Sequence, residues 1–291
     1  MDRIGFIGAG TVGTALAITL AREGYQVAVV ASRTRTSAAA LAAQVPGCTA
    51  LDRAQDVAGA ADLVFITTPD DAIAGVAAAV QWHTGQAVVH CSGAASVDII
   101  GPAAQDGAQV GAFHPLQSFA NVGRAIENIP GSTFAIEAES PLRETLVAMA
   151  TRLHGRPVLL GPGDKVLYHA AAVIVSNYTV ALMKMATELW RQFGVPPSEA
   201  TEAMLPLLRG TVNNIANIGL PTCLTGPIAR GDTGTIERHL AALEQRAPQL
   251  LAAYRDLGLQ AVEVALDKGK VDQTQAARMR AMLEAALLQP A

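Results

Sequence analysis

A glycine pattern near the N-terminus constrains the fold of this chain more than any other feature. Gly8, Gly10 and Gly13 directly follow the apolar stretch RIGFI, and the helix-forming stretch TVGTALAITLARE comes next. A strand, a glycine-rich turn and a helix in this order are typical of the first βα unit of a doubly wound sheet, where the glycines let backbone and helix approach a pyrophosphate. We therefore expect a dinucleotide at this turn. A glycine-rich βα turn without a ligand is the alternative.

The N-terminal half of the chain continues this alternation of strand and helix. Apolar runs with strand character are RIGFIG, QVAVVAS, DLVFITT, QAVVHCS and QVGAFH. Alanine-rich helical patterns lie between them, and a later pair of strands, STFAIEA and RPVLLG, flanks a further helix. Runs that are apolar throughout indicate parallel strands buried on both faces. The sequence predicts an α/β fold class, with a doubly wound Rossmann sheet over residues 1–160.

After Gly161-Pro162-Gly163 the pattern becomes helical. Residues 165–194 form one continuous helical pattern that ends at Gly194 and the two prolines after it. We expect further helices to the C-terminus, broken at Pro206, at the loop TCLTGPIARGD, and near Gly258 and Gly269. Residues 161–291 are therefore predicted to be an all-helical domain that follows the Rossmann domain.

Composition and charge exclude several classes of partner. The 291 residues are 51% hydrophobic and 16% charged, which is typical of a packed globular protein of two domains. The net charge of −4 and the absence of a basic block predict no nucleic-acid partner. Neither a signal peptide nor an apolar run of membrane-spanning length is evident, so we expect a cytoplasmic protein without a membrane partner. Cys48, Cys91 and Cys223 show no metal-ligand spacing, and we expect reduced thiols and no metal.

The end of the second predicted strand indicates which dinucleotide is bound. An NAD site usually has Asp or Glu there to accept hydrogen bonds from the ribose 2′-hydroxyl. This chain has Ser32, Arg33, Thr34 and Arg35 instead, which supply donors and positive charge. Because Arg suits a phosphate in both geometry and charge, the sequence favours NADP(H) over NAD. Arginines that are merely exposed to solvent are the alternative.

Two further strand ends are expected to border the cofactor, since ligands of such sheets lie outside the carboxyl ends of the strands. We expect Asp70 to cap the following helix, and His114 either to face the site or to be a structural histidine. The predicted cofactor-binding residues are Gly8, Gly10, Thr11, Val12, Gly13, Ser32, Arg33, Thr34, Thr68, Pro69, Ser92 and Gly93.

Four polar residues, the first of them Lys165, lie on the apolar helix predicted from residue 165 onward. At about 100° per residue, Lys165, His169 and Ser176 project within roughly 40° of one another, and Asn177 flanks this stripe. Polar side chains among alanines need partners or a task, so we expect the stripe to face a cleft between the domains rather than solvent. A carbonyl or imine reduction needs a proton donor and a substrate anchor. Lys165, His169 and Asn177 are the candidate catalytic residues, with Lys165 and His169 as competing proton donors.

A second group of candidates is expected to bind the substrate. The loop from Thr225 and Gly226 to Arg230 runs into a helix, and Arg230 could hold a carboxylate there. The alternative is that Asp232 pairs with Arg230 and caps the helix. Ser176 and His114 complete the predicted substrate-binding set.

With these residues in view, the chain resembles the Rossmann-like proteins that carry a C-terminal DUF2520 domain. These are relatives of the 6-phosphogluconate dehydrogenase, ketopantoate reductase and pyrroline-5-carboxylate reductase superfamily. The stretches that carry the resemblance include GFIGAGTVGTAL, TTPDDAI, HCSGAAS, FHPLQSFA, YHAAAVIVSNY, MLPLLRGTVNNI and TGPIARGD. The resemblance implies an NADP-dependent oxidoreductase whose helical domain supports a homodimer and closes over the nicotinamide.

The resemblance also implies roles for two residues. In the ketopantoate reductase branch, a Lys and an Asn on the first long helix of the second domain act on the substrate, and Lys165 and Asn177 look like their counterparts. Their spacing of twelve residues is wider than that branch places them, which leaves His169 as a rival.

Three functions follow as hypotheses. The first is an NADPH-dependent reductase of a small 2-oxo or related carbonyl acid, with 2-dehydropantoate as the favoured substrate. The second is an imine reductase of the pyrroline-5-carboxylate type. The third is a protein that senses NADP(H) without turnover.

Overall fold

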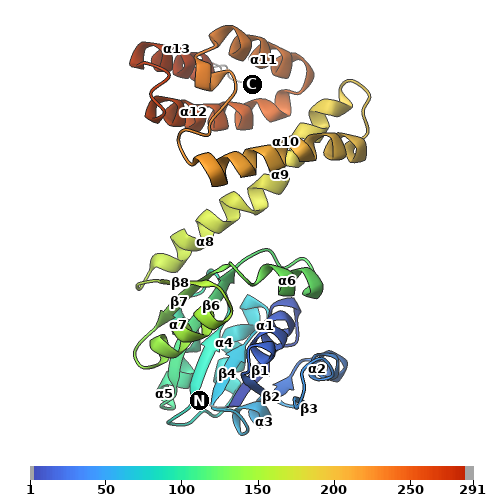
Figure 1. Cartoon of the computed structure of the whole chain (residues 1–291), viewed down its shortest axis with the longest axis vertical. Coiled ribbons are helices and arrows are strands. Elements are labelled where there is room, and N and C mark those ends of the chain that lie inside the picture. Colours follow the sequence, from blue (N-terminus) through green and yellow to red (C-terminus); the bar gives the residue numbers. More distant parts are fainter. Residues whose placement is uncertain (1–2, 286–291) are drawn as a thin grey trace. The chain divides into compact units, whose positions relative to one another are not determined.

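The computed structural model describes residues 3–285 of the chain. They divide into two compact units, the first ending at Asn177 and the second beginning at Tyr178. Figure 1 shows the sheet within the first unit and only helices within the second. The predicted fold class, a Rossmann sheet followed by a helical region, is confirmed.

The first unit is built around one eight-stranded sheet with the order β3-β2-β1-β4-β5-β6-β7-β8. The strands are β1 (Arg3–Ile7), β2 (Gln26–Ala31), β3 (Thr49–Leu51), β4 (Leu63–Ile66), β5 (Ala87–His90), β6 (Gln109–Leu116), β7 (Thr133–Ala138) and β8 (Arg156–Leu159). The pairs from β3 to β6 are parallel, whereas β7 runs antiparallel to β6 and β8 runs parallel to β7. The order reverses between β1 and β4, where ligands of doubly wound sheets bind.

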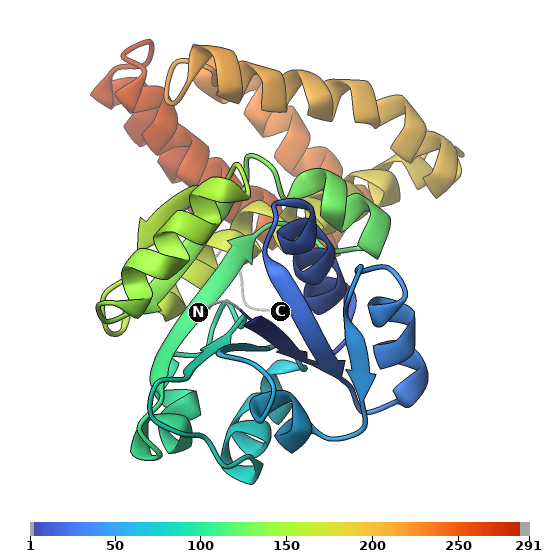
Figure 2. The same ribbon diagram turned by 60° about the horizontal axis from the view of Figure 1, so that its bottom comes forward.

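Helices cover both faces of this sheet, as Figure 2 shows. One face is covered by α1 (Thr11–Arg22), α2 (Arg35–Ala42), α6 (Val122–Asn128) and α7 (Leu142–Arg152). The other is covered by α3 (Ala54–Ala58), α4 (Asp70–Ala79), the 3₁₀ turn η1 (Val97–Ile100) and α5 (Gly101–Gln105). Because both faces of the central strands are covered, β4 and β5 are buried along their whole length and do not alternate, whereas Val158 and Leu159 of the edge strand β8 are exposed.

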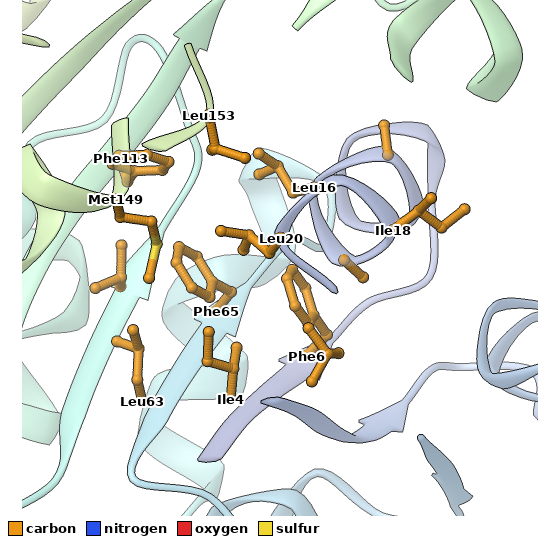
Figure 3. Packing of buried hydrophobic residues seen from close by; sticks show 14 of the residues in the cluster. Ile4, Phe6, Leu16, Ile18, Leu20, Leu63, Phe65, Phe113, Met149 and Leu153 are labelled. Carbon is orange, nitrogen blue, oxygen red and sulfur yellow. The ribbon is translucent and has the colours of Figure 1, made fainter. Parts of the chain in front are cut away.

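The core on the α1 side contains a row of aromatic rings. Phe6 stacks on Phe65 with ring centroids 5.2 Å apart, and Phe65 meets Phe113 edge-on at 6.0 Å. Figure 3 shows Phe6 and Phe65 beneath Leu20 of α1, with Phe113 on the other side of Phe65 from Phe6. This packing fixes α1 over β1 and β4, and it thereby fixes the glycine turn at the start of α1.

The helix that follows the sheet is interrupted. The structure has α8 (Asp164–Val175) and α9 (Asn177–Arg191) in place of one continuous helix, with Ser176 as the C-cap of α8. Serine and asparagine are poor helix formers because their side chains compete for backbone hydrogen bonds, which accounts for the break. By its contacts α8 belongs to the first unit, so the division between the two compact units falls after residue 160 in the sequence. The predicted domain boundary at 160 and 161 stays a prediction.

The second unit contains the remaining helices. After α9 come α10 (Pro197–Ile218), the 3₁₀ turn η2 (Ile228–Arg230), α11 (Thr233–Arg246), the turn η3 (Pro248–Leu250), α12 (Leu251–Asp267) and α13 (Gln273–Glu284). Two expected breaks are wrong, since Pro206 lies inside α10 and Gly258 inside α12. A Cβ on Gly258 would lie 2.9 Å from Leu283 Cδ2, so a glycine at this position allows α13 to pack closely against α12.

Several apolar side chains of the helical region are exposed. On α9 and α10 these include Val180, Leu207 and Val212, the first two more than 70% exposed. Within residues 3–285, the stretch Asp164–Arg191 has the length and mean hydropathy of a membrane-spanning helix, contrary to the expectation from the sequence. Length and composition do not distinguish such a helix from one that packs against another protein chain.

Candidate functional site

A cavity of about 800 Å³ opens at the carboxyl ends of β1, β2 and β4. The residues that line it are Ile7, Gly8, Ala9, Gly10, Ala31, Ser32, Arg33, Thr34, Ser37, Asp52, Ala54, Thr67, Thr68, Pro69, Asp71, Ala72 and Val76. It lies where the strand order reverses, which is the expected position for a dinucleotide.

The three glycines of the first turn do different things in the structure. Gly8 has φ +113°, and a Cβ there would lie 2.7 Å from the carbonyl carbon of Thr67. A Cβ on Gly13 would lie 2.5 Å from Gly8 O, so this residue serves the close packing of α1 against the turn. A Cβ on Gly10, in contrast, would meet no atom within 4 Å and would project into open space at the cavity wall. Only Gly10 therefore keeps space free for a ligand.

The wall formed by the end of β2 is polar and carries one free cation. Thr34 caps α2, and its hydroxyl lies 2.7 Å from Ser37 Oγ. Arg33 is exposed and forms no ion pair with any residue in the described range 3–285. Arg35 instead forms an ion pair with Asp52, the carboxylate on this wall. Ser32, Arg33 and Thr34 thus give this wall hydrogen-bond donors and a positive charge.

The opposite wall holds a buried hydroxyl without a partner. Thr68 Oγ1 is inaccessible and has no hydrogen-bond partner among the described residues. A buried polar atom of this kind is rare in the absence of a ligand or water. Together with the open space at Gly10, it shows that the residues of this cavity fit a dinucleotide. Of the predicted cofactor residues, Thr11, Val12, Gly13, Ser92 and Gly93 do not line the cavity.

A second polar cluster lies at the ends of β5 and β6, and Lys165 is its centre. The side chain of Lys165 is buried at 3% exposure, and its Nζ donates to Ser92 O at 2.6 Å. Burial lowers the pKa of this ammonium from 10.5 to about 8, while the nearby carboxylates of Glu137 and Asp70 act to raise it. An ammonium with this pKa can exchange its proton near neutral pH.

Ser92 connects the cluster to the cavity. Its hydroxyl donates to Asp70 Oδ2 at 2.7 Å and accepts the backbone N–H of Ala95 at 3.0 Å. Asp70 follows Pro69 and precedes Asp71, both of which line the cavity. The expectation that Asp70 caps α4 is wrong, because Pro69 is the N-cap residue and the Asp70 carboxylate is directed to Ser92.

Two histidines and a tyrosine complete the cluster. His114 of β6 lies with its Nδ1 2.8 Å from Tyr168 Oη of α8, and the rings of His114 and His169 are 6.3 Å apart. Burial, with the charges of Lys165 and His169, lowers the pKa of His114 to about 4. A Cβ on Gly93 would lie 2.6 Å from His169 Cδ2 and 2.8 Å from His114 Nε2. The structure therefore brings Lys165, His169 and His114 together.

Two side chains beneath the cluster are held in their neutral forms. His90 is fully buried, accepts the backbone N–H of Ser92 on Nδ1, and has its pKa lowered to about 3, chiefly by burial. Burial raises the pKa of Cys91 to about 12. Neither group carries charge near neutral pH. The three cysteines of the chain are free.

Other predicted residues lie outside this cluster. Ser176 and Asn177 are exposed, and seven residues of helix separate Ser176 from His169 by about 10 Å. Thr225, Gly226 and Arg230 belong to the second unit, where they line a cavity of about 410 Å³ together with Lys268 and Lys270. The roles predicted for these residues stay predictions.

Asp232, in the same loop of the second unit, is the N-cap residue of α11. Its carboxylate caps α11 by accepting from the backbone N–H of Thr235 at 3.0 Å and from the Thr235 hydroxyl at 2.7 Å. Arg230 is thereby left to the cavity wall. Within residues 3–285, no three His, Cys, Asp or Glu side chains are grouped as metal ligands would be.

Sequence reasoning did not find Tyr168, Ser37 or Asp52. A signal for Tyr168 existed, since it lies three residues after Lys165 and one before His169, on the same side of α8. Ser37 lies in the first turn of α2 and Asp52 in the bend after β3, where polar residues are common and carry no distinguishing pattern.

Two family profiles match the chain. Residues 2–115 match the Rossmann-like domain, and residues 132–261 match the domain of unknown function DUF2520. The chain is a Rossmann-like protein with a C-terminal DUF2520 domain. The DUF2520 match starts at the sheet strand β7 and ends within α12, so it includes residues of both compact units. No curated protein matches the chain.

Solved structures share this architecture over nearly the full length. A Bacteroides fragilis protein assigned as an NADP oxidoreductase is 28% identical, with a TM-score of 0.72 over 90% of this chain and 98% of its own. A reductive aminase from Aspergillus terreus in complex with NADPH is 19% identical, with a TM-score of 0.62 over 99% and 94%. A pyrroline-5-carboxylate reductase from Coxiella burnetii is 16% identical, with a TM-score of 0.60 over 95% and 97%. The last two similarities are similarities of fold.

Proposed function

We propose that this Rossmann-like DUF2520 protein is an NADP(H)-dependent oxidoreductase that reduces a small carbonyl acid. The observation that carries the proposal is the connection between cavity and cluster within the first unit. Asp70 lies between two residues of the cavity wall and binds Ser92, whose carbonyl oxygen accepts from Lys165. A cofactor site and an ionisable ammonium thus adjoin at one edge of the sheet.

The cavity supports the assignment of the cofactor. Gly8 and Gly10, with the N-terminus of α1, would hold the pyrophosphate, and Ser32, Arg33 and Thr34 would hold the 2′-phosphate. The carboxylate Asp52 on the same wall is paired with Arg35 and does not oppose a phosphate. The Bacteroides fragilis protein, assigned as an NADP oxidoreductase, supports the same cofactor.

When bound, NADPH supplies a hydride to the carbonyl carbon of the substrate. The carbonyl oxygen then needs one proton, and we propose that Lys165 gives it. With a pKa of about 8, the ammonium is protonated at neutral pH and can still release its proton to an alkoxide. Ser92 O fixes the Lys165 Nζ, and Asp70 fixes Ser92. His169 is the alternative donor from the adjacent turn of α8.

The charge of the cluster supports an anionic carbonyl substrate over an imine. A protonated imine beside the Lys165 ammonium would place two positive charges together, whereas a 2-oxo acid presents an electron-rich carbonyl and a carboxylate. 2-Dehydropantoate is the favoured candidate for the substrate. Reduction of a cyclic imine is the second candidate, because imine reductases share the fold.

The exposed apolar side chains of α9 and α10 support a homodimer. Val180, Leu207 and Val212 are large, apolar and exposed, and contiguous apolar surface on a water-soluble protein marks an interaction site. A second copy that covers these helices would also account for the apolar stretch Asp164–Arg191. We propose a cytoplasmic homodimer without a membrane or nucleic-acid partner.

The experiment is to follow NADPH oxidation by the purified protein with a panel of 2-oxo acids and cyclic imines. We expect turnover with at least one 2-oxo acid, and we expect Lys165→Met to lower kcat by at least about a hundredfold while NADPH affinity is unchanged. Turnover of imines alone, with Lys165→Met fully active, would favour the second candidate. NADPH binding without turnover of any substrate would contradict both.

A further inference from the structure

Tyr168 makes one specific polar contact, and it is with His114. The phenol oxygen lies 2.8 Å from His114 Nδ1, and the two rings meet edge-on with centroids 5.6 Å apart. The partners come from different elements, α8 and β6, which are far apart in sequence. Both side chains are half-buried, and the other nitrogen of His114, Nε2, has no hydrogen-bond partner among residues 3–285.

The chemistry of the two groups decides which of them donates. Burial raises the pKa of Tyr168 to about 12, so its oxygen keeps the proton. His114 is neutral, and the groups that face it are Tyr168, Lys165, His169 and Asp70. A phenol O–H is a stronger donor than a neutral imidazole N–H, and an imidazole nitrogen is a stronger acceptor than a phenol oxygen. Tyr168 therefore donates to Nδ1, and the single imidazole proton stays on Nε2.

Gly93 lies beside His114 Nε2 and leaves room for the imidazole because it has no side chain. An ordinary side chain there would collide with His114 Nε2, at 2.8 Å from its Cβ, and with the ring of His169. The glycine leaves the two imidazoles side by side at the end of β5. Lys165 is bound to the residue before it, Ser92. A neutral N–H donor and a cationic donor thus flank the same short segment.

We propose that Tyr168 is a positioning residue that fixes His114 in the Nε2–H tautomer, so that His114 presents a neutral N–H donor beside Gly93, the residue after the Ser92 carbonyl that holds Lys165. A neutral N–H donor binds an oxygen acceptor of the substrate, which a 2-oxo acid offers and a protonated imine does not. The part concerning the substrate rests on the proposed function. The part concerning the tautomer does not.

The tautomer is measured by ¹⁵N NMR of the imidazole nitrogens in the full-length protein near neutral pH. The chain has six histidines, and a His114→Gln variant identifies the signals of His114. We expect Nε2 of wild-type His114 to be protonated and Nδ1 to be unprotonated. In Tyr168→Phe the two tautomers should mix. A proton on Nδ1 in the wild type overturns the proposal whether or not any variant folds, and so does an unchanged spectrum in a folded Tyr168→Phe protein.

A matched control separates this effect from the loss of any phenol. Tyr178 is exposed on α9, and Tyr178→Phe should leave the His114 signals unchanged. If a substrate is found, Tyr168→Phe should lower kcat about tenfold while NADPH affinity is unchanged, since Tyr168 acts through His114. Equal kcat in the two phenylalanine variants contradicts the role in the reaction. The tautomer result stands apart from turnover, so failure of the proposed function and failure of this inference are distinguishable.

Discussion

Replacing Lys165 with Met should change how the stability of the first unit depends on pH. The ammonium is buried, and its pKa is lowered from 10.5 to about 8. Between these values the unfolded chain binds more protons than the folded protein, so wild-type stability rises with pH through this window. Below pH 8 the burial of the charged Lys165 side chain lowers the free energy of unfolding by its full amount. The Met variant has no ammonium and does not lose this stability.

The magnitude follows from the two pKa values. The cost is about 3 kcal/mol at about pH 6 and falls to about 1.4 kcal/mol at about pH 9.5, at 1.36 kcal/mol for each pKa unit. The wild type should therefore gain about 2 kcal/mol relative to Lys165→Met over this range. Loss of the hydrogen bond to Ser92 O changes the stability difference between wild type and variant by the same amount at every pH, so it does not alter the dependence of that difference on pH.

The assay is urea unfolding followed by tryptophan fluorescence. The chain has two tryptophans, and Trp82 is buried in the first unit, so a Trp190→Phe background makes the signal report that unit. Lys165→Leu is the matched control, because its packing differs from that of Met while the titrating ammonium is absent from both. The two variants should give the same slope against wild type. A difference that is flat with pH, or that falls as pH rises, would contradict a buried Lys165 ammonium with a lowered pKa.

Three further results are expected. Arg33→Ala should weaken NADPH binding about tenfold or more in calorimetry and change NADH binding little, because it removes a charge-assisted bond to the 2′-phosphate. Gly10→Val should abolish NADPH binding at unchanged thermal stability, whereas Gly13→Ala should cost about 1–3 kcal/mol in urea unfolding because its Cβ meets Gly8 O. Arg35→Ala should lower the NADPH-to-NADH affinity ratio several-fold by unmasking Asp52, and Asp52→Asn should restore it; equal loss in both backgrounds would mean that Arg35 binds the phosphate directly.

The parts of the fold that sequence reasoning predicted are those with a local signal. The glycine turn, the buried strands and the helices between them each carry a pattern within about fifteen residues. The strand β3 has only three residues, too few for any periodicity. The reversal of β7 against β6 was not predictable, because an apolar run has no direction.

The candidate site shows the same limit. Lys165, His169 and His114 were found because a polar group among apolar residues stands out. Ser176 and Asn177 were grouped with them because the sequence predicted one continuous helix. In the structure α8 ends at Val175, with Ser176 as its C-cap. Asp70 was assigned to its own helix, whereas its partner Ser92 comes from another strand end. Contacts between residues far apart in sequence leave no pattern in a single chain.

The most direct test of the account is calorimetric titration of the purified protein with NADPH and NADH. We expect one NADPH site per chain with a Kd in the micromolar range, NADH bound at least about tenfold more weakly, and loss of NADPH binding in Gly10→Val. Absence of NADPH binding at millimolar concentration, or undiminished binding by Gly10→Val, would contradict a dinucleotide in the cavity at the ends of β1, β2 and β4.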